Sequence, residues 1–372
     1  MLVSFGGIVG THIAPHPAVA TLPLSLSILG VASMSLPAAL LMQRIGRRPA
    51  FVGSALVGAA AALLCAWSVA QGQFAALCIA GFLLGCNMAF VQQYRFAAAE
   101  YVAPEDAAQA VSTVLLGTLL AALIGPALGT WARDLGGWPQ FTGSYVVLAG
   151  LCIVAALILL QLDPAPSRST TTDAPARPLS AIAAQPDFRL AVVAGVASYA
   201  VMSFIMTATP ISMHVHDGFT PGETTSVISA HLLGMYLPSL ASPWLVRHLG
   251  IRGMMLWGMA AMAVCIGISA LVGHAFVHYF TGLVLLGVGW NLMFVAGTSL
   301  LTTTYAPSER FRAQGANDLA VFGTQACASL FAAAAIESIG WAMLNLASLP
   351  LLALVAVLLW QHSRRAPRAA NA

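Results

Sequence analysis

The sequence predicts an all-α membrane protein that crosses the bilayer many times. Of its 372 residues, 59% are hydrophobic and only 7% are charged, whereas soluble domains carry about 25% charged residues. Apolar segments of about 20 residues, long enough to cross a hydrocarbon core of about 30 Å as helices, recur along nearly the whole chain. A net charge of +3 leaves no basic surface for nucleic acid. We therefore expect the lipid bilayer to be the solvent of this fold.

Eleven full spans are predicted in chain order, each separated from the next by a turn or a polar connection. They lie near residues 20–42, 49–69, 73–93, 109–131, 142–162, 190–211, 223–245, 252–272, 277–300, 313–335 and 341–361. Ahead of them, residues 1–11 are apolar but too short to span. They also lack the basic start and the small-residue cleavage site of a signal peptide.

The arginines predict the orientation, because short cytoplasmic loops are enriched in basic residues. All fifteen basic residues are arginine, and fourteen fall on alternate connections or in the C-terminal tail. Those fourteen are Arg44, Arg47, Arg48, Arg95, Arg168, Arg177, Arg189, Arg247, Arg252, Arg310, Arg312, Arg364, Arg365 and Arg368. Arg133 alone lies on the opposite side. Both termini are therefore expected in the cytoplasm.

Residues 163–188 form the long polar segment of the chain. Their Pro, Ser, Thr and Ala cannot bury a core, so we expect a cytoplasmic linker. The predicted domains are a first six-helix bundle at 1–162, a second at 189–361 and a cytoplasmic tail at 362–372.

An internal repeat relates the two halves. LMQRIG at Leu41–Gly46 recurs as LVRHLG at Leu245–Gly250, and Asn87 recurs as Asn291, each shifted by 204 positions. This shared register predicts two homologous bundles related by a pseudo-two-fold axis. The counterpart of the helix that begins near residue 190 would begin before Met1. The first helix is therefore expected to be truncated in this chain, with in-frame apolar codons upstream.

Two six-helix halves, a central linker and an arginine-rich loop after the second helix resemble the major facilitator superfamily of secondary transporters. The family's loop pattern, Gly-x-x-x-Asp-Arg-x-Gly-Arg-Arg, is matched by Arg44, Gly46, Arg47 and Arg48, while Gln43 replaces the aspartate. The resemblance implies that these residues control the cytoplasmic gate. A neutral glutamine can contribute to that gate only through hydrogen bonds.

Two further resemblances point in different directions. Gly125, Pro126 and Gly129 are similar to the helix kink of exporters in the family. Strings such as MTATP (206–210) and NDLAVFG (317–323) look like a bacterial branch that includes vitamin importers of the riboflavin type. The sequence leaves import and export open.

The resemblance also implies that the first helix of each three-helix unit lines a central cavity. Tyr199, Ser203 and Thr207 recur every four residues and share one helix face. We expect this face to line the cavity, with core packing as the alternative.

Amide and aromatic side chains of the fourth and tenth helices suit a planar, hydrogen-bonding organic substrate. These candidates for the substrate cavity are Asn87, Phe90, Trp290, Asn291 and Phe294. The alternative is that the amides join neighbouring helices.

Ionisable groups inside spans predict coupling to a proton gradient, because a charge in the bilayer is costly and is retained for function. Asp318 is a carboxylate inside a span. It is either a proton carrier, a charge that favours a helix N-terminus, or a partner of Arg310 or Arg312. His231 is the second coupling candidate, with a hydrogen-bonded interhelical histidine as the alternative.

Arg95 ends the fourth predicted helix. It could attract an anionic group or pair with Glu100, and we expect it to form a salt bridge of the gate.

The sequence predicts neither an enzyme nor a cofactor or metal site. It has no lysine, which excludes a P-loop ATPase and a lysine nucleophile. We therefore expect a monomeric secondary transporter of a small organic solute in the bacterial inner membrane, working by alternating access and coupled to protons. One alternative is a drug or metabolite efflux antiporter; another is a membrane-embedded enzyme or sensor.

Overall fold

A computed structural model describes residues 9, 13–16, 19–20, 22–163 and 177–365 of the chain. These described residues are mainly helical and contain no β-strand. They divide into two compact units. The first unit comprises Met1–Ala97, Leu120–Thr170 and Gln314–Leu319; the second comprises Ala98–Leu119, Thr171–Ala313 and Ala320–Ala372.

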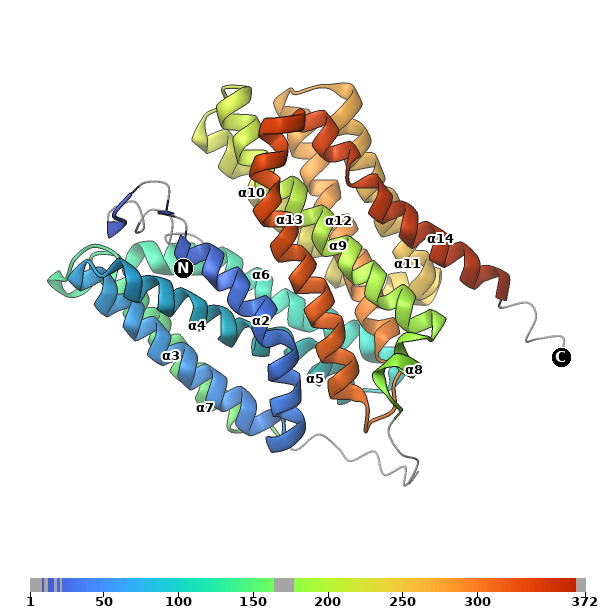
Figure 1. The fold of residues 1–372 in the computed structure, drawn as a ribbon, viewed down its shortest axis with the longest axis horizontal. Coiled ribbons are helices and arrows are strands. Elements are labelled where there is room, and N and C mark those ends of the chain that lie inside the picture. The colour runs from blue at the N-terminus through green and yellow to red at the C-terminus, as the bar shows by residue number, and fades with distance from the viewer. Residues whose placement is uncertain (1–8, 10–12, 17–18, 21, 164–176, 366–372) are drawn as a thin grey trace. The chain divides into compact units, whose positions relative to one another are not determined.

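The first unit is built around four long helices (Figure 1). They are α2 (Leu22–Ile45), α3 (Arg47–Gln71), α4 (Phe74–Gln92) and α7 (Thr142–Leu159). Helix α2 packs on α4, while α3 packs on both α4 and α7. Cys65, Leu77 and Tyr145 lie in the buried apolar core of this unit, and Val9 packs into the same cluster.

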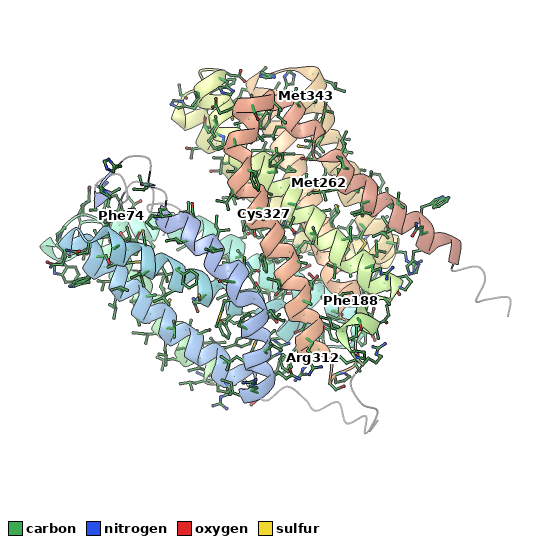
Figure 2. The ribbon with its side chains drawn as sticks, in the orientation of Figure 1. Phe74, Phe188, Met262, Arg312, Cys327 and Met343 are labelled. Atoms are coloured by element: carbon green, nitrogen blue, oxygen red, sulfur yellow. The ribbon has the colours of Figure 1, made fainter. Side chains whose placement is uncertain are left out.

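In the second unit α12 is the central helix, because α9, α10 and α11 all pack against it. The helices are α8 (Leu179–Ala183), α9 (Pro186–Pro210), α10 (Pro221–Tyr236), α11 (Ser242–Gly267), α12 (Phe276–Leu301), α13 (Arg310–Leu346) and α14 (Leu349–Arg365). Helix α14 packs on α9 and α11. Buried side chains such as Phe188 of α9 and Met262 of α11 build its core (Figure 2).

Three helices contribute residues to both units. They are the short helix α5 (Tyr94–Glu100), α6 (Ala107–Trp131) and α13. The second and third turns of α13, at Gln314–Leu319, belong to the first unit. This placement brings polar residues of α13 to the loop after α4.

Glycines allow close helix packing at related places in the two units. A Cβ atom at Gly85 of α4 would overlap the carbonyl oxygen of Ser27 in α2. A Cβ atom at Gly287 of α12 would lie 2.5 Å from the carbonyl oxygen of His231 in α10. Both helix pairs therefore need glycine at the contact.

Glycine backbones also end helices at repeated positions. Gly46 separates α2 from α3 with φ 86° and ψ 164°. Gly250, 204 positions later, kinks α11 with φ 66° and ψ 168°. Left-handed φ values of this kind favour glycine. The predicted repeat is thus visible in the backbone torsions.

Each of the eleven predicted spans corresponds to helical residues in the structure, but several helices begin or end at other residues than predicted. Eight helical segments of the described chain are long and apolar enough to span a membrane, and one of them, Arg310–His362, contains two predicted spans. The predictions at 109–131 and 223–245 correspond to α6 and α10. Helix α10 ends early, at Tyr236, where a turn containing Pro238 follows.

Some predicted features lie outside the described residues. Most of the truncated first helix and residues 164–176 of the linker are among them, as is the tail after residue 365. The predicted domain boundaries stay a prediction, since the compact units assign the starts of α6 and α13 differently.

Candidate functional site

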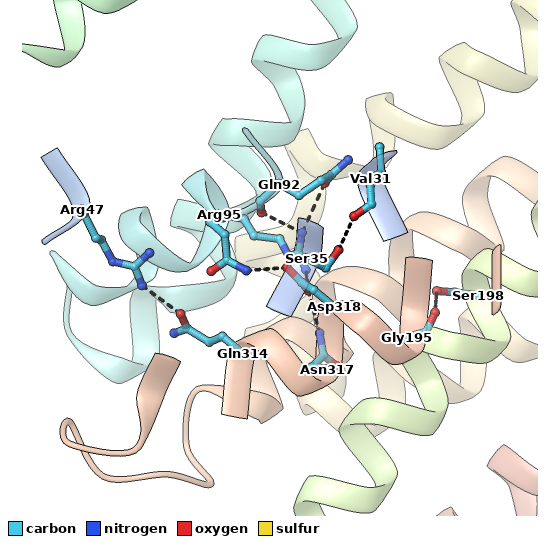
Figure 3. A network of polar contacts seen from close by, with 11 residues as sticks. Val31, Ser35, Arg47, Gln92, Arg95, Gly195, Ser198, Gln314, Asn317 and Asp318 are labelled. Atoms are coloured by element: carbon cyan, nitrogen blue, oxygen red, sulfur yellow. Dashed lines mark hydrogen bonds and ion pairs between the residues drawn. The ribbon is translucent and has the colours of Figure 1, made fainter. Parts of the chain in front are cut away.

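A buried polar network surrounds Asp318, in the third turn of α13 (Figure 3). Arg95 of α5 forms an ion pair with the Oδ1 atom of this carboxylate. The side-chain amide of Gln93 donates to Oδ2 at 2.6 Å, and that of Asn317 donates to Oδ1 at 3.0 Å. Donors therefore reach both carboxylate oxygens, as expected of an ionised aspartate.

Further contacts fix the Arg95 side chain. Its Nη1 atom donates to the backbone carbonyl of Gln92 at 2.7 Å and lies 3.2 Å from the Gln92 Oε1 atom. Its Cζ atom stands 4.4 Å from the centre of the Phe96 ring. Both Arg95 and Asp318 are at most 2% exposed. The pair is therefore enclosed by several contacts and removed from bulk solvent.

The ion pairs described here differ from two of the alternatives that the sequence left open. Arg95 pairs with Asp318, and Glu100 pairs with Arg310 at 3.3 Å. Helical residues meet on one face at spacings of three or four, so a spacing of five turns Glu100 away from Arg95. Asp318 likewise binds neither Arg310 nor Arg312 in the contacts described.

The predicted gate loop contributes one buried arginine to the same region. Arg47, at the start of α3, donates from Nη2 to the Oε1 atom of Gln314 at 2.9 Å (Figure 3). Gln43, Arg44 and Arg48 are exposed. Of the loop residues predicted to act in gating, Arg47 is therefore the one that the structure brings to α13.

A second charged contact lies beside the loop between α12 and α13. The Arg177 guanidinium donates to both carboxylate oxygens of Glu309, at 2.8 and 2.7 Å. These hydrogen bonds lower the pKa of Glu309 from 4.5 to about 2. Arg177 lies within the predicted linker, so this contact holds that part of the linker on the second unit.

An aromatic cluster lies among four helices of the second unit. Its members, hereafter the aromatic cluster, are Tyr199 of α9, Tyr236 of α10, Trp290 and Phe294 of α12, and Phe322 of α13. Tyr199 meets the rings of Trp290, Phe294 and Phe322 edge-on, with centroids 5.0–5.3 Å apart. The indole N–H of Trp290 is buried and meets no hydrogen-bond partner among the described residues.

The predicted stripe on α9 faces α12 and α13. Two turns after Tyr199, the hydroxyl of Thr207 lies 3.2 Å from the hydroxyl of Ser329 in α13. Ser203, one turn after Tyr199, is buried. Tyr199, Trp290 and Phe294, all predicted cavity residues, therefore meet in one cluster. In this structure their rings pack on one another.

The other cavity candidates make helix-to-helix contacts. Asn291 donates to the carbonyl oxygen of Met235 and to the Ser239 hydroxyl, each at 2.7 Å. Asn87 packs over Gly58 of α3, and Phe90 is buried in the first unit. The geometry of both amides fits the alternative in which they join helices.

The remaining predicted residues have individual settings. His231 is fully buried, and its Nδ1 atom lies 2.8 Å from the carbonyl oxygen of Leu283 in α12. Because a carbonyl only accepts, Nδ1 carries the proton. Helix α6 continues without interruption through Gly125, Pro126 and Gly129.

Several residues of these clusters were not predicted from the sequence. Gln93, Gln314 and Asn317 complete the network around Asp318 and Arg47, and Phe322 and Tyr236 complete the aromatic cluster. One usable signal was present, since Phe322 follows Asp318 by four positions and so shares its helix face.

Comparisons with known proteins agree with this architecture. The model of the Major Facilitator Superfamily matches residues 1–217 and again 191–372. The riboflavin transporter RfnT of Brucella anthropi is 39% identical over 364 residues, which cover 96% of this chain and 90% of that protein.

Solved structures show the same fold at low sequence identity. The fucose:proton symporter FucP of E. coli matches with a TM-score of 0.70 at 12% identity, covering 96% of each chain. The human organic anion transporter MFSD10 matches with a TM-score of 0.72 at 18% identity, covering 96% of this chain and 89% of that one. With helices that can span a membrane, a family match along both halves and a transporter as a near relative, the chain belongs to the Major Facilitator Superfamily and is a bacterial membrane transporter rather than an enzyme.

Proposed function

We propose that this protein takes up riboflavin across the bacterial cytoplasmic membrane. The observation that carries the proposal is its 39% identity to a riboflavin transporter over 96% of the chain. A relationship of this extent covers both halves of the chain.

The aromatic cluster supports a flat, ring-shaped substrate. Aromatic rings attract one another in edge-on and offset arrangements, each pair contributing about 0.5–1.5 kcal/mol beyond burial. The isoalloxazine ring of riboflavin is flat and could replace part of the ring-to-ring packing around Tyr199. The buried N–H of Trp290 is available to donate to a carbonyl oxygen of that ring.

The transport cycle is proposed to be alternating access, with the two bundles rocking around a midplane site. In the structure the rings of the cluster are buried, so a substrate must separate them to bind. The contacts that Arg47 and Arg95 make with α13 are the proposed gate, because they join segments 267 and 223 positions apart.

Protons are the proposed energy source. Each charge that moves through the membrane potential supplies about 2.3 kcal/mol per 100 mV. Asp318 is the proposed carrier, because protonation would weaken its hold on Arg95 and so link the gate to the gradient. His231 stays the second candidate. The arginine pattern supports a cytoplasmic location for both termini.

The test is uptake of labelled riboflavin into proteoliposomes under an inward proton gradient. We expect accumulation that a protonophore abolishes. Tyr199→Ala removes a ring with three aromatic contacts and should raise KM about tenfold. Tyr199→Phe keeps the ring and should stay close to wild type.

A matched control is Tyr279→Phe, since Tyr279 is a buried tyrosine of α12 that lies outside the aromatic cluster. Equal KM values for Tyr199→Ala and wild type would reject the cluster as the binding site. No riboflavin uptake by a folded wild-type protein would reject the substrate.

Efflux is the second candidate, because Gly125–Gly129 of α6 resembles the exporter motif. In everted vesicles an exporter accumulates substrate inside, whereas the proposed importer accumulates it in right-side-out vesicles. The sign of this difference decides the direction.

A further inference from the structure

We propose that the second unit binds the headgroup of an anionic phospholipid at the end where the linker joins it. A small pocket lies between the start of α9 and the end of α14. Its lining combines apolar side chains with cationic and amide groups: Ala184, Pro186, Arg189, Leu358, Gln361 and His362. Such a mixture suits a phosphate attached to a hydrocarbon chain.

Two arginines lie at or beside this pocket, since Arg189 lines it and Arg252 contacts its lining residue His362. His362 pairs through Nε2 with Asp187 of α9, the acid described in contact with it. The Nη2 atom of Arg252 lies 3.2 Å from the same ring nitrogen, although Nε2 can serve only one of these groups as a donor or acceptor. An anion beside them would relieve this competition and neutralise the excess positive charge.

Two side chains at the pocket have nitrogen atoms that lack a partner among the contacts described. The Nδ1 atom of His362 is buried and meets no hydrogen-bond partner among the described residues. Arg189 is exposed, and the hydrogen bond described for it leaves from Nε to the carbonyl oxygen of Ala183 at 2.8 Å. Its two terminal nitrogens are thus free of the contacts described and can reach a phosphate.

The pocket also lies at the level expected of lipid headgroups. Along α14, exposed Leu354 and Val357 give way to Trp360, which is 53% exposed, and then to Gln361 and His362. Tryptophan marks the boundary between hydrocarbon and water in membrane proteins. A phosphate at His362 would therefore lie in the headgroup layer with its acyl chain beside Leu358, which favours a lipid over a soluble phosphate.

The test compares lipids with soluble phosphates on the purified full chain. Melting temperatures are measured in detergent with added phosphatidylglycerol, phosphatidylcholine, glycerol 3-phosphate or inorganic phosphate. We expect phosphatidylglycerol to raise the melting temperature more than phosphatidylcholine does, and the two soluble phosphates to have no effect. A shift as large with glycerol 3-phosphate as with phosphatidylglycerol would overturn the assignment to a lipid.

Variants locate the effect. Arg189→Gln and Arg252→Gln should each weaken the apparent affinity for phosphatidylglycerol about fivefold. This factor corresponds to the binding free energy of about 1 kcal/mol that one arginine contributes near an anionic membrane surface. Gln361→Glu adds a negative charge at an exposed position and should weaken it as well. Arg133→Gln, which removes an exposed arginine elsewhere, should leave it unchanged.

All four substituted positions are exposed, so the variants should fold, and a single size-exclusion peak checks this. Unchanged lipid affinity in Arg189→Gln, Arg252→Gln and Gln361→Glu would overturn the proposal. The same result would leave the proposed riboflavin uptake unaffected.

Discussion

At the scale of single residues, Asp318 binds donors from two distant parts of the chain. Arg95 and Gln93 come from the loop after α4, and Asn317 is its neighbour on α13. Burying two charges costs several kcal/mol per ion, and the attraction between them repays it only when the geometry is good. Such a pair stabilises little on balance but is sensitive to the loss of either partner, which suits the gate contact proposed above.

The first prediction concerns this ion pair. Asp318→Asn should destabilise the protein by about 3–5 kcal/mol, because Arg95 then stays buried without its counter-ion. Arg95→Gln should do the same. The double variant should lose less than the sum of the two single losses, since no charge is left uncompensated. The melting temperatures of wild type, the two single variants and the double variant are measured in detergent. If the two single losses of stability simply add up in the double variant, the pairing is contradicted.

The same variant tests the proposed coupling. If Asp318 carries the proton, Asp318→Asn should abolish accumulation of riboflavin against a gradient but retain exchange of internal for external substrate. Accumulation equal to that of wild type would reject the carrier role. The stability prediction would still stand, so the two roles are separable.

The second prediction concerns Glu309, whose pKa the hydrogen bonds from Arg177 lower to about 2. Because the pKa of Glu309 is lower in the folded state, its contact with Arg177 stabilises the folded protein fully above about pH 4.5. This stabilisation is lost as the pH falls toward 2. Glu309→Gln removes this dependence. The difference in melting temperature between wild type and Glu309→Gln should therefore shrink as the pH is lowered from 6.

A control for this effect is Glu105→Gln in the corresponding loop of the first half, where the side chain is exposed. That variant should follow wild type over the same pH range. A constant difference between wild type and Glu309→Gln at all pH values would contradict the assignment.

At the scale of helices, packing depends on residues that have almost no side chain. Water is absent between membrane helices, so their association relies on van der Waals contact and small interface residues. The contact of α2 with α4 at Gly85 and that of α10 with α12 at Gly287 follow this rule. Related halves of the chain thus use glycine for the same purpose.

The third prediction tests this packing. Gly85→Val should destabilise the first unit by more than the 1–3 kcal/mol that is typical of overpacking, because the added side chain meets the Ser27 backbone, which cannot rotate away. Gly53→Ala on α3 is the control, since no atom lies within 4 Å of its added Cβ. This control should be neutral or stabilise by up to about 1 kcal/mol. Thermal unfolding of both variants is compared in one detergent. Equal melting temperatures would refute the need for glycine at position 85.

At the scale of the whole molecule, the proposed alternating access requires contacts that form in one state and break in another. Arg47 binds Gln314, whereas Arg48, its neighbour in the same loop, is exposed. The two arginines therefore separate the effect of a specific contact from the effect of loop charge.

The fourth prediction follows from this difference. Arg47→Gln should weaken the contact with Gln314 and increase labelling, by a water-soluble reagent, of a cysteine placed at the buried neighbour Ala313, compared with the same cysteine beside native Arg47. Arg48→Gln should leave the labelling unchanged. The KM for riboflavin should stay the same in both variants, because neither arginine lies in the aromatic cluster. Equal labelling in the two variants would contradict a specific role for Arg47.

Much of this molecule follows from its sequence. Apolar segments of spanning length predict the helices, because backbone groups in lipid must be hydrogen-bonded within the segment. The offset of 204 positions predicts related halves, and the left-handed glycines Gly46 and Gly250 agree with it. The four-residue spacing from Tyr199 to Thr207 likewise predicts a shared helix face, which contacts Phe322 and Ser329 of α13.

The partners of the buried charges were decided by the tertiary structure alone. Arg95 and Asp318 are 223 positions apart, and the repeat relates neither residue to the other. Local spacing suggested Glu100 and the arginines near Asp318, since nearby residues are the visible candidates in a sequence. The partners of Arg95 and Asp318 depend on which groups the fold buries together, because a buried charge is stable only next to a counter-ion or hydrogen-bond partner. Helix periodicity is a local property of the chain, whereas charge pairing across helices becomes defined only when those helices pack.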